Sequence, residues 1–452
     1  MKKLMIITTV AVLLSGCGIY KPYSRPEVKT DNLFGETVET GDTATIANLH
    51  WEDMFTDTHL QQLIHKGLEN NTDLQIAQLR ITQAEASLMS AKLAYFPSVS
   101  LNPQGSLSSY DGSDVAKTYQ LPVNASWELD VFGKQTNVKR QKEAAVEQSD
   151  IYRQAVQTQL ISSIANSYYT LLMLDSQLEI TRKTAMLWEE NIKTMRALKQ
   201  AGLTTEAAVV QAEANKYTID ASIIDLCRQI TEVENALCAT LGETPHDIER
   251  GKLEGQSLPD ELELGVPLQL LSNRPDVMMA ETSLKQAFYA TNEARAYFYP
   301  SLTLSGSLGW TNSGGGGINN PGAWLWQAMG NLTQPIFNKG TNKARLEISK
   351  AQQEEAKLNF QQTLVNAGSE VNNILAQIQA TSDKVVLYEQ QIILLESAVN
   401  STQLLMKHGD TTYLEVLTAQ QSLLSAQLAQ ISNRFSEIQA AITLYRALGG
   451  GR

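Results

Sequence analysis

A very long stretch without helix breakers constrains this fold more than any other feature. From residue 134 to residue 201 the chain contains neither glycine nor proline, and it is rich in Ala, Gln, Leu, Lys and Glu. These residues are compatible with helix, and one helix of this length would be on the order of 100 Å long. A second stretch, from residue 341 to 408, contains only Gly368 as a breaker. Helices this long do not fit a compact globule, so we expect a coiled coil or the wall of a tube.

The two long stretches belong to a repeat that covers most of the chain. Corresponding residues in the two halves lie 203 to 207 positions apart; they are Asp73 and Asp276, Pro97 and Pro300, Phe132 and Phe337, and Gly202 and Gly409. A register that drifts by so little indicates one structural unit written twice.

We therefore predict two repeats of the same design, at residues 51–245 and 274–452, joined by a linker at 246–273. Each repeat has a helix, a proline, two strands and a long helical hairpin. The expected strands are 98–110, 118–131, 301–311 and 323–336, and the expected hairpins are 134–241 and 340–448.

The strands show strict alternation. Tyr119, Leu121, Val123 and Trp127 occupy every second position, with polar residues among those between them. One apolar face over this length is typical of a transmembrane strand of roughly 9–11 residues. An amphipathic sheet that covers a soluble core would show the same alternation. The tryptophans favour the membrane reading because they suit an interfacial girdle, and those we expect there are Trp127, Trp310, Trp324 and Trp326.

The expected strands, two in each repeat and four in the chain, cannot close a barrel alone. An open sheet edge in lipid leaves unpaired amides that cost several kcal/mol each, so several chains must share one barrel. Pro97 and Pro300 then mark the two breaks where helix gives way to barrel wall. Proline suits this position because it lacks an N–H and its φ is fixed.

The N-terminus has the pattern of a targeting segment. Two lysines precede an apolar run that ends in "LSGC" at Cys17. The charge and the apolar run predict a signal peptide over residues 1–16. The small-small-Cys ending resembles a bacterial lipobox, which implies that Cys17 is acylated and begins an extended segment at 17–50. Gly18 follows the cysteine, which by the same resemblance favours the outer membrane.

Composition and motifs argue against several other classes. A net charge of −12 disfavours nucleic acid as a partner. The five histidines form neither an i,i+4 pair nor H-E-x-x-H, and the glycine run at Ser313 lacks the Lys-Ser/Thr of a phosphate loop. We find no nucleophile with its base, and we predict a protein that is not an enzyme and needs no cofactor or metal.

Four segments resemble the outer-membrane factor family of TolC-like exit ducts. They are "WEDMFTDTHLQQLIHKGLENN" from Trp51, "LLSNRPDVMMAETSL" from Leu270, "EARAYFYPSLTL" from Glu293 and "LTQPIF" from Leu332. The similarity extends over nearly the whole chain after Cys17, and the lipobox matches the lipoprotein branch that serves resistance-nodulation-division efflux pumps.

The resemblance implies a mixed α and β membrane protein that is a homotrimer. Its twelve-stranded transmembrane barrel would lie in the lipid of the outer membrane and continue into a long α-helical barrel in the periplasm. The implied partners are a periplasmic membrane-fusion adaptor and an inner-membrane resistance-nodulation-division transporter. The linker would contribute to an equatorial belt.

The resemblance also implies a working end where the helical hairpins turn. The turns are Gly202-Leu203-Thr204-Thr205 and Gly409-Asp410-Thr411-Thr412, and they would contact the adaptor. A capping glycine followed by an N-cap threonine explains the same residues structurally, and both glycines are expected to be left-handed.

An acidic gate is implied at the periplasmic mouth. Glu415 lies where the family places one such acid, with Asp410 as the next candidate. Thr418 and Ala208 stand where some members have further acids. Glu415 as a solvated residue near a helix N-terminus is the structural alternative.

Two function classes remain at this point. One is a passive exit channel of a tripartite efflux system; the other is a secretion duct or a coiled-coil envelope spacer. A spacer has no use for alternating, Trp-rich strands, which favours the channel. The family's pump selects the cargo, so drug, metal, bile salt and protein all stay open.

Overall fold

The computed structural model describes residues 20–26, 50–256, 273–312, 322–408 and 412–451. The chain divides into two compact units, each assembled from segments of both halves of the sequence. None of the described helices is both long enough and apolar enough to cross a membrane.

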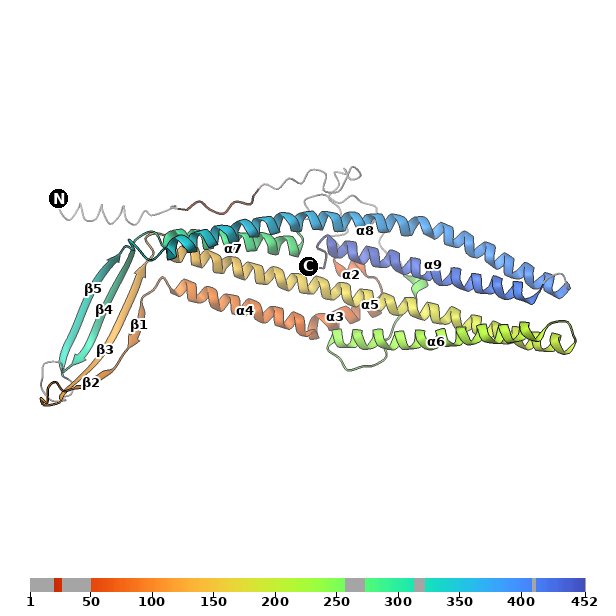
Figure 1. Ribbon diagram of the computed structural model, residues 1–452, viewed down its shortest axis with the longest axis horizontal. Coiled ribbons are helices and arrows are strands. Elements are labelled where there is room, and N and C mark those ends of the chain that lie inside the picture. Colours follow the sequence, from red (N-terminus) through yellow and green to blue (C-terminus); the bar gives the residue numbers. More distant parts are fainter. Residues whose placement is uncertain (1–19, 27–49, 257–272, 313–321, 409–411, 452) are drawn as a thin grey trace. The chain divides into compact units, whose positions relative to one another are not determined.

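Both halves of the chain contain a helix, strands, a very long helix and a shorter helix in that order, and the first half has additional elements at its start and end (Figure 1). The first half contains α2 (Trp51–Met54), α3 (Thr58–Asn70), α4 (Thr72–Leu93), β1 (Ser98–Leu101), β2 (Gln104–Ser108), β3 (Ala116–Leu129), α5 (Lys134–Gln200), α6 (Glu206–Leu241) and the 3-10 turn η3 (Leu253–Gly255). The second half contains α7 (Pro275–Ala296), β4 (Ser301–Thr311), β5 (Ala323–Thr333), α8 (Thr341–His408) and α9 (Tyr413–Ala447).

The first unit contains one antiparallel sheet, with β1, β3, β4 and β5 side by side in that order (Figure 1). The first expected strand is divided into β1 and β2, and both pieces pair with β3. The division falls at Asn102 and Pro103, because proline has no N–H to donate to the ladder. Consequently β1 and β5 form the two edges of the sheet within the chain.

Close packing between β3 and β4 depends on one glycine. Gly309 lies opposite Pro122 in the register of the two strands. A Cβ at this position would lie 2.7 Å from the Pro122 Cα and closer still to the Leu121 carbonyl oxygen. Both neighbours are backbone atoms, so the sheet has no room for a side chain here.

The seven described residues of the N-terminal segment pack against the same unit. The Tyr23 ring meets Phe288 of α7 edge to face, with centroids 5.7 Å apart. Arg25 lies 3.5 Å from Glu281 and its guanidinium lies over the Phe360 ring. Burial raises the pKa of Tyr23 to about 12. This segment therefore runs along the helices of the first unit as an extended strap.

In the second unit, polar side chains hold the loops to the helices. The Asp57 carboxylate caps α3 and also accepts hydrogen bonds of 2.8 Å from Tyr168 and from Gln256. Burial opposes ionisation of Asp57, but these hydrogen bonds outweigh it and lower its pKa. Arg250 pairs with both Asp175 and Glu234. The described part of the predicted linker, residues 246–256, is thus fastened to α5 and α6.

Arg274 forms a second polar cluster in this unit. Its side chain is only 9% exposed and pairs with Asp276 at 2.9 Å and with Glu370 at 2.6 Å. It also donates to the carbonyl of Ala447 at the end of α9. Arg446 reaches the same Glu370. One buried guanidinium therefore ties the start of α7 to α8 and α9.

Candidate functional site

The first hairpin tip lies between α5 and α6, and its turn is fully described. Gly202 has a φ of +72°, the left-handed conformation expected for it. The Gly202 amide donates to Lys199 and the Leu203 amide donates to Leu198, which closes the helix end. Thr205 then caps α6 by accepting from the Ala208 amide at 3.3 Å. These hydrogen bonds define the turn, and Leu203 is 74% exposed at its apex.

Charged pairs link the two helices next to this tip. Arg196 of α5 lies 2.6 Å from Glu213 of α6, and Lys199 pairs with Glu206 across the turn. All four side chains are at least partly exposed. Exposed pairs contribute little to stability, so we expect them to add at most about 1 kcal/mol each.

The second tip is only partly described. Gly409, Asp410 and Thr411 lie outside the described residues. Thr412 is the N-cap residue of α9, and Glu415 lies in the first turn of this helix, where its amide donates to the Thr412 carbonyl. The Glu415 side chain is exposed in the single chain. A carboxylate in the first turn is stabilised by the helix dipole whichever role it has.

A hydrophobic core lies directly behind both tips and joins α5, α6 and α9. Its buried members are Ala185, Trp188, Ile192, Met195, Val209, Ala212, Ile219, Tyr413 and Leu417. Ala208 and Met406 pack against it from the edges. Burial raises the pKa of Tyr413 far above its usual range. Tyr413 and Leu417 lie two residues before and two residues after Glu415, and both are buried in this core. They anchor the first turn of α9, which carries Glu415.

The two positions at which the chain departs from the acidic pattern have other roles. Ala208 contacts the core just described. The Thr418 hydroxyl donates to the Leu414 carbonyl at 2.8 Å within α9. Further along the helices, Asn191 of α5 donates to Gln420 of α9 at 2.9 Å, and Gln420 is buried. A neutral hydrogen bond therefore connects the two hairpins where a further acid is absent.

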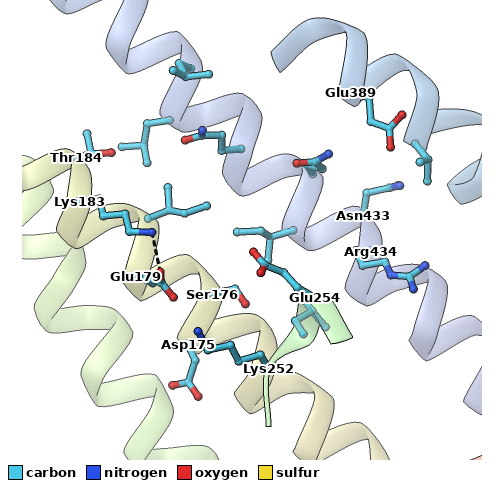
Figure 2. A pocket seen from close by; sticks show the side chains of 18 of the residues that line it. Asp175, Ser176, Glu179, Lys183, Thr184, Lys252, Glu254, Glu389, Asn433 and Arg434 are labelled. Atoms are coloured by element: carbon cyan, nitrogen blue, oxygen red, sulfur yellow. Dashed lines mark hydrogen bonds and ion pairs between the residues drawn. The ribbon is translucent and has the colours of Figure 1, made fainter. Parts of the chain in front are cut away.

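A groove of about 1360 Å³ lies between α5, α8, α9 and η3 (Figure 2). Figure 2 shows Glu179 and Lys183 of α5 joined by a hydrogen bond, with Lys252 and Glu254 on the η3 side and Glu389 and Arg434 on the other helices. Pairing with Lys183 lowers the pKa of the exposed Glu179.

The charges that line this groove are mostly neutralised by neighbours. Lys183 pairs with Glu179, and Arg434 pairs with Glu437 at 2.6 Å. Among the described residues, no group of three or more His, Cys, Asp or Glu is arranged to hold a metal ion. The groove is therefore lined by a mixture of apolar side chains and of charged side chains that are mostly paired.

The helix-to-strand prolines occupy equivalent places. Pro97 lies between the end of α4 and the start of β1, and Pro300 lies between α7 and β4. The predicted lipidation residue, Cys17, lies outside the described residues. Tyr20 is the first described residue. Its ring lies beside Gly133, just before α5, where an added Cβ would be 3.3 Å from a ring carbon.

Two features were not predicted from the sequence. The motif that contains Arg274 and Asp276 supported the resemblance, but no role was expected for either residue. The buried amide of Gln420 was also not predicted, and the neighbouring Gln421 is exposed. The partner of Gln420 is Asn191, which is 229 residues away in the sequence.

Comparison with known proteins gives a consistent result. The family model described as "Outer membrane efflux protein" matches residues 63–243 and 266–450. The chain is 30% identical to the cation efflux system protein CusC of Escherichia coli O6:H1 over 98% of this chain and 97% of that protein. It is also 30% identical to the toluene efflux pump outer membrane protein TtgC of Pseudomonas putida, over 100% of this chain and 96% of that protein.

Solved structures agree with the sequence matches. The open state of the Neisseria gonorrhoeae MtrE outer membrane channel has a TM-score of 0.87 and 28% identity, and the match covers 96% of this chain and 98% of that one. Such agreement over nearly the whole length extends to both the strands and the long helices.

Proposed function

The chain belongs to the outer membrane efflux protein family and is the outer-membrane exit channel of a tripartite efflux system, and we propose from this premise how its parts work. It has the mixed α and β fold of the trimeric outer-membrane channels. Its relatives are channel proteins rather than enzymes. We infer that its partners are a periplasmic membrane-fusion adaptor and an inner-membrane resistance-nodulation-division transporter.

One observation carries the channel assignment. The chain supplies a single antiparallel sheet with two edges, and the same chain contains helices of 67 and 68 residues. An open edge in lipid leaves amides unpaired, which closure with further copies prevents. Three copies would close the wall and surround one axis with their long helices.

We propose that Cys17 carries the lipid anchor. The "LSGC" sequence supports this, and so does the strap of residues 20–26 against the first unit. One acyl anchor adds membrane affinity without spanning the bilayer. Replacing Cys17→Ala should abolish incorporation of a radioactive fatty acid into the protein. Label that persists on this variant would contradict the proposal, and Cys227→Ala serves as the control that keeps its label.

We propose that both hairpin tips, 202–205 and 409–412, dock to the adaptor. The hydrogen-bonded turn at Gly202 and the exposed Leu203 at its apex support this role. Because Gly202 has no neighbouring atom within 4 Å of a Cβ, Gly202→Val would strain only the local backbone. A left-handed conformation costs an L-residue about 1–2 kcal/mol, and a β-branched one more.

We therefore expect Gly202→Val to reduce efflux and adaptor co-purification while the trimer persists. Asparagine tolerates the left-handed region, so Gly202→Asn should retain both activities. If the valine variant instead fails to form trimers, the tip is a folding element and the docking assignment is wrong.

We propose that Glu415 forms the acidic gate, with Asp410 as the second candidate. Three-fold symmetry would bring three Glu415 carboxylates around one axis. Two carboxylates about 6 Å apart repel by roughly 3 kcal/mol at an effective dielectric near 20, so such a ring attracts cations. Tyr413 and Leu417, which are both buried, would hold the first turn of α9 in place.

The gate and the channel can be tested together in planar bilayers. The wild type should conduct, and Glu415→Gln should lower both its cation preference and its block by multivalent cations added on the periplasmic side. Glu355→Gln removes an exposed acid from the first quarter of α8 and should change neither property. Unchanged block in a well-folded Glu415→Gln trimer would remove Glu415 from the gate and leave Asp410 to be tested.

A further inference from the structure

An aromatic stack lies where the sheet meets the helices. Phe132, just after β3, stacks on Tyr299, just before β4. Their ring centroids are 5.0 Å apart and the rings are inclined by 11°. The stack joins two neighbouring strands of the sheet at their helical ends.

The sequence repeat supplies a second pair of the same kind. Phe132 corresponds to Phe337, 205 residues later, and Tyr299 corresponds to Phe96, 203 residues earlier. Phe337 follows β5 and Phe96 precedes β1. Both members of the stack therefore recur as aromatic residues at the equivalent ends of the edge strands.

This second pair does not meet within one chain. Strands β1 and β5 lie at opposite edges of the sheet. Accordingly, Phe337 is 86% exposed and Phe96 is 67% exposed, whereas in the stacked pair Tyr299 is 41% exposed and Phe132 is half-buried. Ile336, next to Phe337, is 96% exposed. Large apolar side chains this exposed at a sheet edge are typical of a surface that another chain covers.

A side-chain hydrogen bond holds the helix-to-strand turn in each half of the chain. In the first half, the Trp127 indole donates to the Tyr95 carbonyl at 2.8 Å. In the second half, the Gln334 amide donates to the Phe298 carbonyl at 3.2 Å. Tyr95 and Phe298 are 203 residues apart, the same offset as Phe96 and Tyr299. The turns that carry Phe96 and Tyr299 therefore occupy equivalent places in the two halves, and each is held by a residue of its own half.

We propose that Phe337 of one protomer stacks on Phe96 of the next protomer, at each seam of the closed barrel. The occupant of both exposed edges is thus a second copy of this chain. In a closed ring, β5 of one copy lies beside β1 of its neighbour, as β3 lies beside β4 within the chain. The inference rests on the trimeric channel and goes beyond it by naming the residues at the seam.

Cross-linking tests the contact directly. In a background lacking Cys227, with Cys238 fully buried, the pair Phe96→Cys and Phe337→Cys is treated with a short bismaleimide. We expect covalent dimers and trimers on a denaturing gel. The pair Phe132→Cys and Tyr299→Cys is the matched control, since it should cross-link within one chain and stay at monomer mass. Either of the single variants Phe96→Cys and Phe337→Cys should give no covalent oligomer.

Native mass, measured before cross-linking, separates the possible failures. A trimer that gives no covalent oligomers overturns the seam contact alone. Oligomers from Phe337→Cys by itself also overturn it, because the same residue would then meet its own copy. A monomeric native mass overturns the trimeric premise and the contact with it.

A second measurement does not depend on cysteines. Phe96→Leu and Phe337→Leu should each lower the temperature at which the trimer dissociates. The double variant should lower this temperature by less than the sum of the two single effects. Phe132→Leu combined with Phe96→Leu should instead be additive, because these residues belong to different stacks. If the decreases in dissociation temperature from Phe96→Leu and Phe337→Leu are additive, the proposal is overturned.

Discussion

Replacing Arg274→Ala should destabilise the second unit by about 3 kcal/mol. Removing one partner of a buried ion pair costs roughly 3–5 kcal/mol. We expect the lower end because the Asp276 and Glu370 side chains left behind are 47% and 32% exposed. The Ala447 carbonyl would also lose its buried donor. Chemical unfolding of the purified protein, followed by far-ultraviolet circular dichroism, measures the change.

A matched control for this prediction is Arg228→Ala. Arg228 is 56% exposed and pairs with Glu232 on the surface of α6. Exposed pairs are worth 0 to about 1 kcal/mol, so its loss should be small. If Arg274→Ala and Arg228→Ala lower the free energy of unfolding equally, the burial of Arg274 does not add to the stability of the protein.

The same cluster predicts a dependence of stability on pH. Burial opposes ionisation of Asp276, but Arg274 outweighs it and lowers the pKa of this carboxyl. A lowered folded pKa contributes stability that is present above the ordinary carboxyl pKa and lost as the pH falls through the folded value. The Arg274→Ala variant should therefore lose less stability than the wild type on acidification.

Replacing Gly309→Ala should prevent the sheet from forming in its native register. The added Cβ would meet the backbone of Leu121 and Pro122, and neither can move without breaking the β3–β4 ladder. Overpacking lowers the stability of a protein by about 1–3 kcal/mol where side chains can adjust. Because the neighbours of Gly309 are backbone atoms, we expect a loss of at least about 3 kcal/mol here. The result should be loss of trimers from the outer-membrane fraction.

Gly105→Ala provides the control within the same sheet. A Cβ at Gly105 of β2 would lie 3.8 Å from the Thr118 carbonyl oxygen, which is an ordinary contact. This variant should reach the outer membrane in normal amount. Normal trimers from Gly309→Ala would mean that β3 and β4 pair in a different register in the assembled barrel.

Local signals in the sequence were enough to predict the long helices. The stretch free of glycine and proline coincides with α5, and the break at Gly202 separates α5 from α6. Helix length and strand alternation depend on neighbours a few residues away, which a sequence displays directly. The proposal that the two halves are one repeated unit also comes from the sequence alone.

Contacts between distant segments required the tertiary structure. Helical spacing places Leu414, Leu417, Leu424 and Ile438 on one face of α9. The last three are buried, but Leu414 is 55% exposed. Periodicity assigns a residue to a face of the helix, and only the packing of α5, α6 and α8 decides how far along that face the core extends. Arg274 could not be recognised as a buried tie for the same reason, since Glu370 is 96 residues away.

The sequence by itself determined the long helices, the alternating strands, the helix breaks at Pro97 and Pro300, and the residue types available at the tips. These properties follow from backbone geometry and from residues close together in the chain. The tertiary structure decided which residues are covered, which edges of the sheet are free and where the first expected strand divides. The pairing of β3 with β4 joins segments more than a hundred residues apart, and no local pattern encodes that distance.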